Sequence, residues 1–439
     1  MRGFFIIITV LTVFVKFSGA QEFYTLKQCI ETGLERNYSI RIIKNEEIIT
    51  GNNATPGYAG YLPTVDLNGT YSGSLKDNTY HNRGSENLTE KGINNNMLDA
   101  GINLNWTVFD GFGIQADYAR LKELKNMGEL NTRIEIENLV TNIAAEYYNL
   151  IRQRIRLQNL RSAVQLSKER LRIVEERYII GSMSRLELQQ AKVDFNADSS
   201  QLVTQIETVY ISQVSLNTLM GLDSVDRHYA VADTIIITEP LLEKEDLMNK
   251  TFHNNVLLLA SLSNTKISEF ELKKTRSRNY PYLRLNAGYG LTDNWYEVGT
   301  VALQRSLGMT YGVTVGFNIF DGFNRRREQR NARIRIENND LRRQELELSL
   351  KADLSNLWMA YRNNLDLWNL EKENLKTAQE NHEIAIERYK LGDLSGIELR
   401  EAQNNLLEAE ERQSITEYNT KLCEISLLQL SGQILNYIE

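Results

Sequence analysis

The sequence predicts an α+β membrane protein built from two similar halves, each with two β-strands, a long helix and a shorter helix. Three observations support this fold class. Segments in which apolar and polar residues alternate occur twice in each half, as in half-buried strands. A seven-residue apolar repeat follows in each half, which is typical of a coiled coil. From the motif FDGF onward the two halves align at a constant offset of 211 residues.

A stretch that occurs twice marks where the two long elements of each half meet. It is RYIIGSMSRLELQQA at 177–191 and RYKLGDLSGIELREA at 388–402. Gly181 and Gly392 stand where a helix ends in a left-handed residue, a conformation that glycine adopts without steric cost. Each copy is therefore expected to begin with the end of a helix.

A new helix is expected to start directly after each glycine. Ser184 is followed three residues later by Glu187, and Ser395 by Glu398. This spacing predicts a capping box, in which the serine oxygen accepts from the N3 amide and the glutamate accepts from the serine amide. Both copies are thus predicted to be helix–turn–helix junctions.

The N-terminal residues have the features of a secretory signal peptide, predicted over residues 1–20. Arg2 supplies the positive charge, residues 4–15 form a short apolar run, and small residues precede a cleavage site at Gln21. No later apolar run is long enough to span a bilayer as a helix. The sequence therefore predicts an exported protein that no transmembrane helix holds.

The first repeat is predicted over residues 21–242. It opens with a short helix over 25–37 and a second helix that ends near Asn53, before Pro56 and Pro63. The further elements are strands 62–73 and 101–109, a long helix 113–180, a helix 184–220 and a linker 222–242 with the β-like run Ile235-Ile236-Ile237. Residues 74–97, rich in Asn, Ser, Gly and charge, are expected to form an exposed loop.

The second repeat is predicted over residues 243–439 and has the same order of elements. A short helix over 247–255 and another helix precede strands 282–291 and 309–320, with a loop over 292–308 between them. A long helix 323–391 and a helix 395–431 complete the repeat. FDGF stands at the strand–helix junction in both halves, at 109–112 and 320–323.

The long helices carry the apolar repeat of a left-handed coiled coil. A helix of about 66 residues is roughly 100 Å long, more than a compact soluble domain needs. The repeat positions are Ile136, Ile143, Leu150, Leu157, Val164, Leu171 and Tyr178 in the first half, and Leu354, Tyr361, Trp368, Leu375, His382 and Tyr389 in the second.

Four strands per chain cannot close a barrel, and open strand edges are not tolerated in lipid. Several chains could close one together, and three chains would give twelve strands. The glycines and small polar residues on one strand face suit a water-filled lumen. Aromatic residues at the strand ends suit the girdles of a transmembrane barrel; they are Trp106, Phe109, Phe112, Tyr280, Tyr282, Trp295, Phe320 and Phe323.

The duplicated element order, the FDGF junctions and the RYxxGxxSxxEL turns resemble the TolC-type outer-membrane efflux proteins over essentially the whole mature chain. The resemblance implies a homotrimer whose twelve-stranded barrel contacts outer-membrane lipid. It also implies a long α-helical barrel in the periplasm with an equatorial domain formed by the short helices, the linker and the C-terminus. The implied partners are a periplasmic adaptor (membrane fusion) protein and an inner-membrane pump of RND or ABC type.

The resemblance also implies that the turns dock the adaptor. Packing in the helical seam is an equally good explanation for the two tyrosines of the turns, and capping explains their glycines and serines. The candidate docking residues are Arg177, Tyr178, Gly181, Ser184, Leu188, Arg388, Tyr389, Gly392, Ser395 and Leu399.

By the same resemblance, acidic residues after the second turn ring the closed periplasmic end of the channel. Glu398 and Glu401 are three residues apart and share a helix face. Their first-half equivalents are Glu187 and Gln190. Some members of the family lock this end with a basic residue where this chain has Leu394, so the sequence does not indicate how the end is locked.

The remaining chemistry of the chain is sparse. With 50 Lys and Arg against 57 Asp and Glu, the net charge of −7 argues against a nucleic-acid partner and an anionic membrane surface. No catalytic motif, metal-ligand spacing or cofactor motif occurs, so no enzyme activity is expected. Cys29 and Cys423 are compatible with a disulfide or with two buried thiols. The competing hypothesis is an exported trimeric coiled-coil stalk or adhesin.

Overall fold

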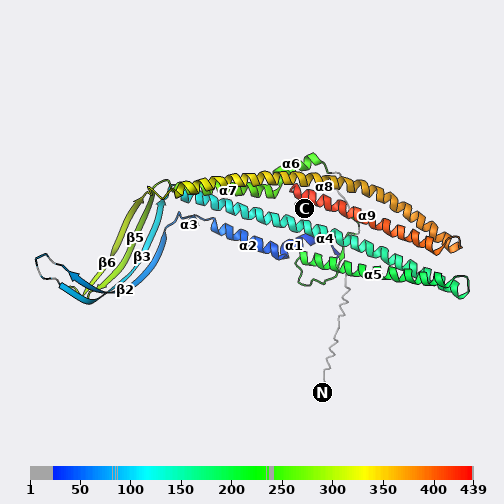
Figure 1. Ribbon diagram of the computed structural model, residues 1–439, viewed down its shortest axis with the longest axis horizontal. Coiled ribbons are helices and arrows are strands. Elements are labelled where there is room, and N and C mark those ends of the chain that lie inside the picture. Colours follow the sequence, from blue (N-terminus) through cyan, green and yellow to red (C-terminus); the bar gives the residue numbers. More distant parts are fainter. Residues whose placement is uncertain are drawn as a thin grey trace, which may run out of the picture. The chain divides into compact units, whose positions relative to one another are not determined.

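The computed structural model describes residues 23–81, 83–84, 86, 88–233, 235–236 and 242–437. The predicted signal peptide and part of the predicted linker lie outside these residues. No helix in the described ranges has an apolar stretch that could cross a membrane. The elements, in chain order (Figure 1), are β1 (Phe23–Tyr24), α1 (Leu26–Arg36), α2 (Tyr38–Asn53), α3 (Pro56–Ala59), β2 (Thr64–Tyr80), β3 (Leu88–Phe109), α4 (Gly113–Ile179), α5 (Arg185–Leu219), β4 (Ala230–Val231), α6 (Lys244–Asn254), α7 (Val256–Ser277), β5 (Tyr282–Trp295), β6 (Leu303–Gly316), α8 (Asn324–Leu391), α9 (Gly396–Leu430) and a 3-10 helix (Ile434–Tyr437).

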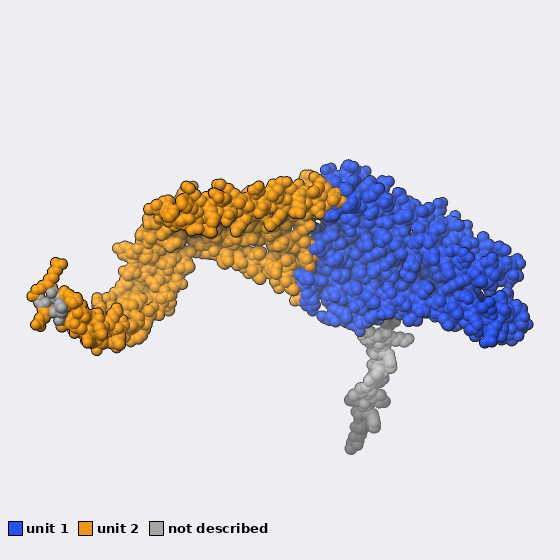
Figure 2. All heavy atoms as spheres, viewed as in Figure 1, with its two compact units in different colours: residues 1–40, 136–251, 353–439 blue, residues 41–135, 252–352 orange. Residues whose placement is uncertain are grey.

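The chain divides into two compact units, which Figure 2 colours separately. Unit 1 contains the two helix–turn–helix junctions, and unit 2 contains the main β-sheet. Helices α4 and α8 contribute residues to both units. Unit 1 comprises residues 1–40, 136–251 and 353–439, and unit 2 comprises residues 41–135 and 252–352.

The main sheet of unit 2 is antiparallel, with the strand order β2-β3-β5-β6. One row of paired residues across it is Leu67, Ile102, Tyr289 and Met309. All four side chains are more than half exposed, at 80%, 53%, 58% and 67%. The row that follows Leu67, from Asn68 to Gly101, Gly290 and Gly308, lies on the other face, because successive residues of a strand alternate. The sheet therefore has one apolar and one small-polar face, and its apolar face is exposed.

The strands are longer than predicted, and the predicted loop over 74–97 was wrong. β2 continues to Tyr80 and β3 begins at Leu88, so this region is largely a paired ribbon that closes with Tyr80 opposite Leu88. β5 likewise continues to Trp295 and β6 begins at Leu303, while β6 ends at Gly316 and not at 320. Polar composition indicated a loop, but a ribbon leaves polar side chains exposed while its backbone groups pair.

An ion pair lies on the apolar face of the sheet, near the end of β5 and the start of β6. Arg305 donates to both carboxylate oxygens of Asp293, at 2.8 and 2.7 Å, directly across the strand pair. The Asp293 side chain is only 3% exposed beneath the guanidinium. In β5 and β6, this charged pair thus takes the place of apolar side chains two residues before Trp295.

The FDGF motifs form the strand–helix junctions by the same local chemistry. The carboxylate of Asp110 accepts from the backbone amide of Ile114 at 3.0 Å, and that of Asp321 from the amide of Arg325 at 3.0 Å. Each aspartate thus satisfies an orphan amide in the first turn of a long helix. The sequence alone did not reveal this capping role.

The last phenylalanine of each FDGF motif is held in a strained backbone conformation. Phe112 and Phe323 have φ values of +70° and +63°, directly after glycines that are also left-handed. This conformation costs a bulky residue about 1–2 kcal/mol. Both rings nevertheless stay exposed, at 59% and 60%, and stack edge-on against Phe109 and Phe320. The fold thus presents an aromatic pair at the base of the sheet in both halves.

Unit 1 contains two antiparallel helical hairpins, α4–α5 and α8–α9, as Figure 1 shows. Its main core is formed by side chains of α1, α2, α4, α5, α9 and the 222–236 segment. Among the predicted seam residues, Ile143, Leu150, Leu354 and Tyr361 are fully buried. Tyr178, the last residue of the apolar repeat in α4, is 40% exposed, so the repeat is less buried at the first turn.

Both cysteines are free thiols. Cys29 is completely buried in the core of unit 1, and burial raises the pKa of its thiol to about 12. Cys423 is half-buried and packs with Leu427 and Tyr361 in a separate cluster. The structure therefore favours the second of the two sequence-based alternatives, unpaired thiols.

The linker strand lies earlier than predicted. β4 pairs in parallel with β1, with Phe23 opposite Ala230 and Tyr24 opposite Val231. Of the predicted β-like run, Ile235 and Ile236 are not in a strand, and Ile237 lies outside the described residues. Ile236 is instead a buried core residue, which explains its apolar character.

Candidate docking turns and gate residues

Both helix–turn junctions have the predicted geometry. Gly181 and Gly392 have φ values of +76° and +89°. The amide of Ser182 donates to the carbonyl of Arg177 at 2.8 Å, and the amide of Asp393 to that of Arg388 at 2.9 Å. These are the hydrogen bonds of a Schellman motif, which satisfies terminal carbonyls of a helix.

Both capping boxes are complete. The amide of Ser184 donates to Glu187 at 2.7 Å, and the amide of Glu187 donates to the Ser184 hydroxyl at 3.2 Å. Ser395 and Glu398 repeat this arrangement at 2.9 and 3.3 Å. Hydrogen bonds from the serine backbone and side chain hold the pKa of both glutamates below the usual range. The serines and glutamates of the turns thus have a full structural role.

The two tyrosines of the turns are not equivalent. Tyr389 is buried, at 4% exposure, whereas Tyr178 is 40% exposed. The guanidinium of Arg177 lies 5.9 Å from the Tyr389 ring, a cation–π distance that joins the first turn to the second. Burial raises the pKa of Tyr389, and the nearby Arg170 and Arg177 partly offset this shift. In this chain, packing accounts for Tyr389, and Tyr178 remains available at the surface.

The candidate leucines also pack inside their own hairpins. Leu399 is 3% exposed and lies with Tyr389 in one cluster, and Leu188 is 8% exposed beside Val174 in another. Arg388 is exposed and contacts the carbonyl of Asp393 at 3.5 Å. Contacts with a partner would therefore involve Arg177, Tyr178, Arg388 and the turn backbone more than the leucines.

Exposed apolar residues that the sequence interpretation missed surround both turns. Their exposure lies between 74% and 80%, which is unusual for large aliphatic side chains. They fall outside the seven-residue repeat, and this is the signal that could have identified them. They are Ile179, Ile180 and Leu186 at the first turn, and Leu391 and Ile397 at the second.

A largely apolar pocket of about 200 Å³ lies between the two turns. Met183 and Leu186 line it from the first hairpin, and Gly396 and Ile397 from the second. Glu187 and Gln190 also reach its wall. Residues of both copies of the repeated stretch therefore meet at one surface of unit 1.

The candidate gate residues are those that the resemblance implies at the closed periplasmic end of the channel, namely Glu398, Glu401, Glu187 and Gln190. They differ in the hydrogen bonds that their side chains form. Glu398 is fixed by its capping box, and Gln190 donates to Asp194 at 3.0 Å. Glu401 is exposed on α9, one turn after Glu398. Leu394, at the position where the resemblance implies a basic lock residue in some members, packs against the cluster of Tyr389 and Leu399.

Buried ion pairs beyond the turns were not foreseen from the sequence. Arg170 of α4 pairs with Asp194 of α5, and also donates to the carbonyl of Gly396 at 3.3 Å. Arg400 of α9 donates to both oxygens of Asp198 on α5, at 2.7 Å each. Their partners lie on different helices and far apart in sequence, so spacing gave no signal.

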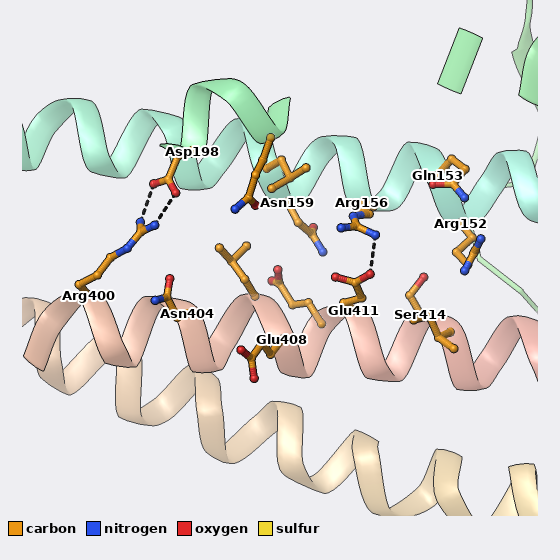
Figure 3. Close-up of a pocket in the computed structure, with 15 residues that line it drawn as sticks. Arg152, Gln153, Arg156, Asn159, Asp198, Arg400, Asn404, Glu408, Glu411 and Ser414 are labelled. Atoms are coloured by element: carbon orange, nitrogen blue, oxygen red, sulfur yellow. Dashed lines mark hydrogen bonds and ion pairs between the residues drawn. The ribbon is translucent and has the colours of Figure 1, made fainter. Parts of the chain in front are cut away.

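A polar cavity of about 300 Å³ lies beside the second of these pairs, between α4, α5 and α9. Figure 3 shows Arg400 and Asp198 at one end of it and the pair of Arg156 and Glu411 further along. The hydroxyl of Ser414 also lines it without a hydrogen-bond partner. Its positive and negative groups largely neutralise each other. In the described residues, no group of three or more His, Cys, Asp or Glu could hold a metal ion.

Several solved structures share this fold. The Campylobacter jejuni CmeC outer membrane channel matches with a TM-score of 0.78 and 17% identity, covering 93% of this chain and 85% of that one. The outer membrane protein VceC from Vibrio cholerae matches with a TM-score of 0.72 and 16% identity, covering 93% and 96%. The open state of the Neisseria gonorrhoeae MtrE outer membrane channel matches with a TM-score of 0.72 and 13% identity, covering 93% and 89%. Comparison with curated protein sequences gives no match.

The family-level comparison covers both repeats. The profile described as outer membrane efflux protein matches residues 49–222 and 247–433, which is most of the chain. These ranges include the sheet, both long helices and both turns. The chain therefore belongs to the outer membrane efflux protein family.

Proposed function

We propose that three copies of this chain form a passive exit channel of the outer membrane, with four strands from each copy in one twelve-stranded barrel. As a member of an efflux-channel family, the protein is not an enzyme. The observation that carries the trimeric barrel is the main sheet. Its apolar face is exposed, and in the described part of the chain β2 and β6 each pair along one edge only.

A barrel closed by further copies of the chain would account for both the exposed apolar face and the unpaired strand edges. The four strands alternate in direction, so β6 of one copy would run antiparallel to β2 of the next. Joining these edges removes the unpaired backbone groups, which lipid does not tolerate. The apolar face would then contact outer-membrane lipid, and the Asn, Thr, Ser and Gly face would line the lumen.

The helical part would extend into the periplasm, with the two turns at its tip. The exposed aliphatic side chains and the apolar pocket between the turns favour contact with a helical partner. A periplasmic adaptor protein is the proposed partner, and an inner-membrane pump of RND or ABC type would supply the energy. Docking would use Arg177, Tyr178, Arg388 and the turns at Gly181 and Gly392.

The proposed gate lies one turn inside the second tip. Three copies of Glu398 and Glu401 would place about six carboxylates near the channel axis, where they attract cations. Glu401 is the stronger candidate because Glu398 already serves as a cap. Glu187 and Gln190 are the weaker first-half equivalents.

Cell fractionation and gel migration test this function. The protein should be recovered with the outer membrane and should migrate as a trimer without heating and as a monomer after boiling. The alternative, an exported coiled-coil stalk or adhesin, predicts a protein whose strands are not in lipid. Extraction from membranes by carbonate or urea, without detergent, would support that alternative and refute the channel.

A further inference from the structure

We propose that an arginine stripe at the start of α8, formed by Arg326, Arg330 and Arg333, binds anionic phospholipid headgroups of the membrane leaflet that faces the periplasm. This inference rests on the proposed insertion of the sheet in the outer membrane. It assigns a lipid-binding surface to the start of α8, a segment for which the sequence predicted no binding role.

The three arginines share one face of α8, because they lie at positions i, i+4 and i+7. All three are exposed, and in the described part of the chain none forms an ion pair with a carboxylate. The opposite face of the helix contacts α7. There Asn339 donates to the Ser268 hydroxyl at 2.8 Å and Arg335 reaches Glu271 at 4.0 Å. Protein packing thus accounts for the α7 side of the helix and leaves the stripe without an explanation.

The depth of the stripe follows from the aromatic pair beside it. The guanidinium of Arg326 lies 5.6 Å from the ring of Phe323, which in turn stacks on Phe320 at 5.3 Å. Exposed aromatics at the end of a transmembrane sheet lie at headgroup level. From Arg326 to Arg333 the helix rises about 10 Å, so the stripe covers the headgroup layer.

The strain at Phe323 indicates the direction of the membrane. Its left-handed backbone, with φ at +63°, holds a large apolar ring in an exposed position. In water that arrangement would be unfavourable, whereas at a lipid interface the exposed ring is stabilised. The guanidinium of Arg326 lies over this ring, and Arg330 and Arg333 follow on the same face of α8, so a membrane that receives the ring also meets the stripe.

The first half of the chain lacks this stripe. At the offset of 211 residues, the equivalents of the three arginines are Gln115, Ala119 and Lys122. Residues 325–335 contain six arginines and one glutamate, a local charge of +5, whereas residues 114–124 contain two basic and two acidic residues, a charge of 0. The negative net charge of the whole chain therefore hides one strongly basic segment.

Phosphate is the chemistry that this segment fits. Guanidinium groups donate paired, planar hydrogen bonds that match phosphate oxygens. Clusters of basic residues at a membrane surface attract anionic lipids. Phosphatidylglycerol carries one exposed phosphodiester and a net negative charge, so it is the lipid with which to test the surface.

The test measures lipid enrichment around the reconstituted full-length protein. The wild-type protein is placed in nanodiscs of phosphatidylethanolamine with one-fifth phosphatidylglycerol, briefly extracted with mild detergent, and its retained lipids are quantified. We expect phosphatidylglycerol to be enriched about threefold over the bulk composition, and to lose this enrichment at high salt. The triple variant Arg326→Gln, Arg330→Gln, Arg333→Gln should fall to about the bulk ratio.

A matched control removes the same charge elsewhere. The triple variant Arg161→Gln, Lys168→Gln, Lys376→Gln changes exposed residues of unit 1 and should keep the wild-type enrichment. Enrichment that persists in the stripe variant would overturn the inference. So would a stripe variant that changes only the ion selectivity of the channel, because the arginines would then face the lumen. Failure of the wild-type protein to insert into bilayers would instead refute the proposed function.

Discussion

Arg400 of α9 is bound by both carboxylate oxygens of Asp198 on α5, at 2.7 Å each, and Asp198 is only 2% exposed. The pair joins the second helical hairpin of unit 1 to the first. It also holds the pKa of the Arg400 guanidinium above its usual range, chiefly through these hydrogen bonds. Together with the hydrogen bond from Arg170 to the carbonyl of Gly396, this pair is a polar tie between the hairpins beside the proposed gate residues on α9.

Removal of one partner should loosen the start of α9. Asp198→Ala leaves a largely buried guanidinium without its carboxylate, which is expected to lower the local free energy of unfolding by about 3 kcal/mol. Hydrogen exchange of peptides covering 396–412 measures this. Glu411→Ala, which breaks the exposed pair with Arg156, is the control and should cost less than about 1 kcal/mol. Equal exchange in the two variants would show that the buried pair does not join the hairpins.

Bulk at the turn glycines should block docking without affecting assembly. Nothing lies within 4 Å of a Cβ placed on Gly181 or Gly392, so a side chain there meets no steric obstacle within the chain. Gly181→Arg and Gly392→Arg should each abolish export while the trimer level stays normal. Gly181→Ala and Gly392→Ala carry the same left-handed strain, about 1–2 kcal/mol, and should retain export. Export that continues in both arginine variants would refute docking at these turns.

The ends of the strand ribbons should lie outside the cell. Strands replace much of the predicted loops 74–97 and 292–308, because β2 continues to Tyr80, β3 begins at Leu88, β5 continues to Trp295 and β6 begins at Leu303. Single cysteines at His81 and Val298 should react with a membrane-impermeant maleimide on intact cells. The wild-type chain gives the background, since Cys29 is buried and Cys423 half-buried. Reaction only after the envelope is broken would invert the proposed topology.

Neutralising the proposed gate should change ion selectivity. Glu401→Gln, alone and together with Glu398→Gln, should lower cation selectivity in planar bilayers and weaken block by multivalent cations from the periplasmic side. Glutamine can still complete the capping box, so the turn should be preserved. Glu187→Gln is the matched control from the first half, and a smaller effect is expected. If the double variant behaves as wild type, the narrowest point of the channel lies elsewhere.

The helices and turns could be predicted because local sequence patterns encode them. Contacts between residues distant in sequence could not be predicted from these patterns. The predicted helix over 113–180 corresponds to α4 at Gly113–Ile179, because periodicity and caps are encoded within a few residues of each end. The ribbon that replaces the loop over 74–97 depends on backbone pairing, which composition does not record. The pairs of Asp194 and Asp198 with arginines, and the burial of Tyr389 but not Tyr178, depend on packing between hairpins.

The central claim is that three copies close one barrel through β2 and β6. It is tested with variants that carry one cysteine on β2 and one on β6. Outer membranes that contain each variant are oxidised, and the products are separated by gel electrophoresis with and without heating. For pairs in register, we expect cross-linked dimers and trimers and no larger species, because a closed ring has no free edge. Cross-links confined to single chains, or a ladder that extends beyond trimers, would contradict a closed barrel of three copies.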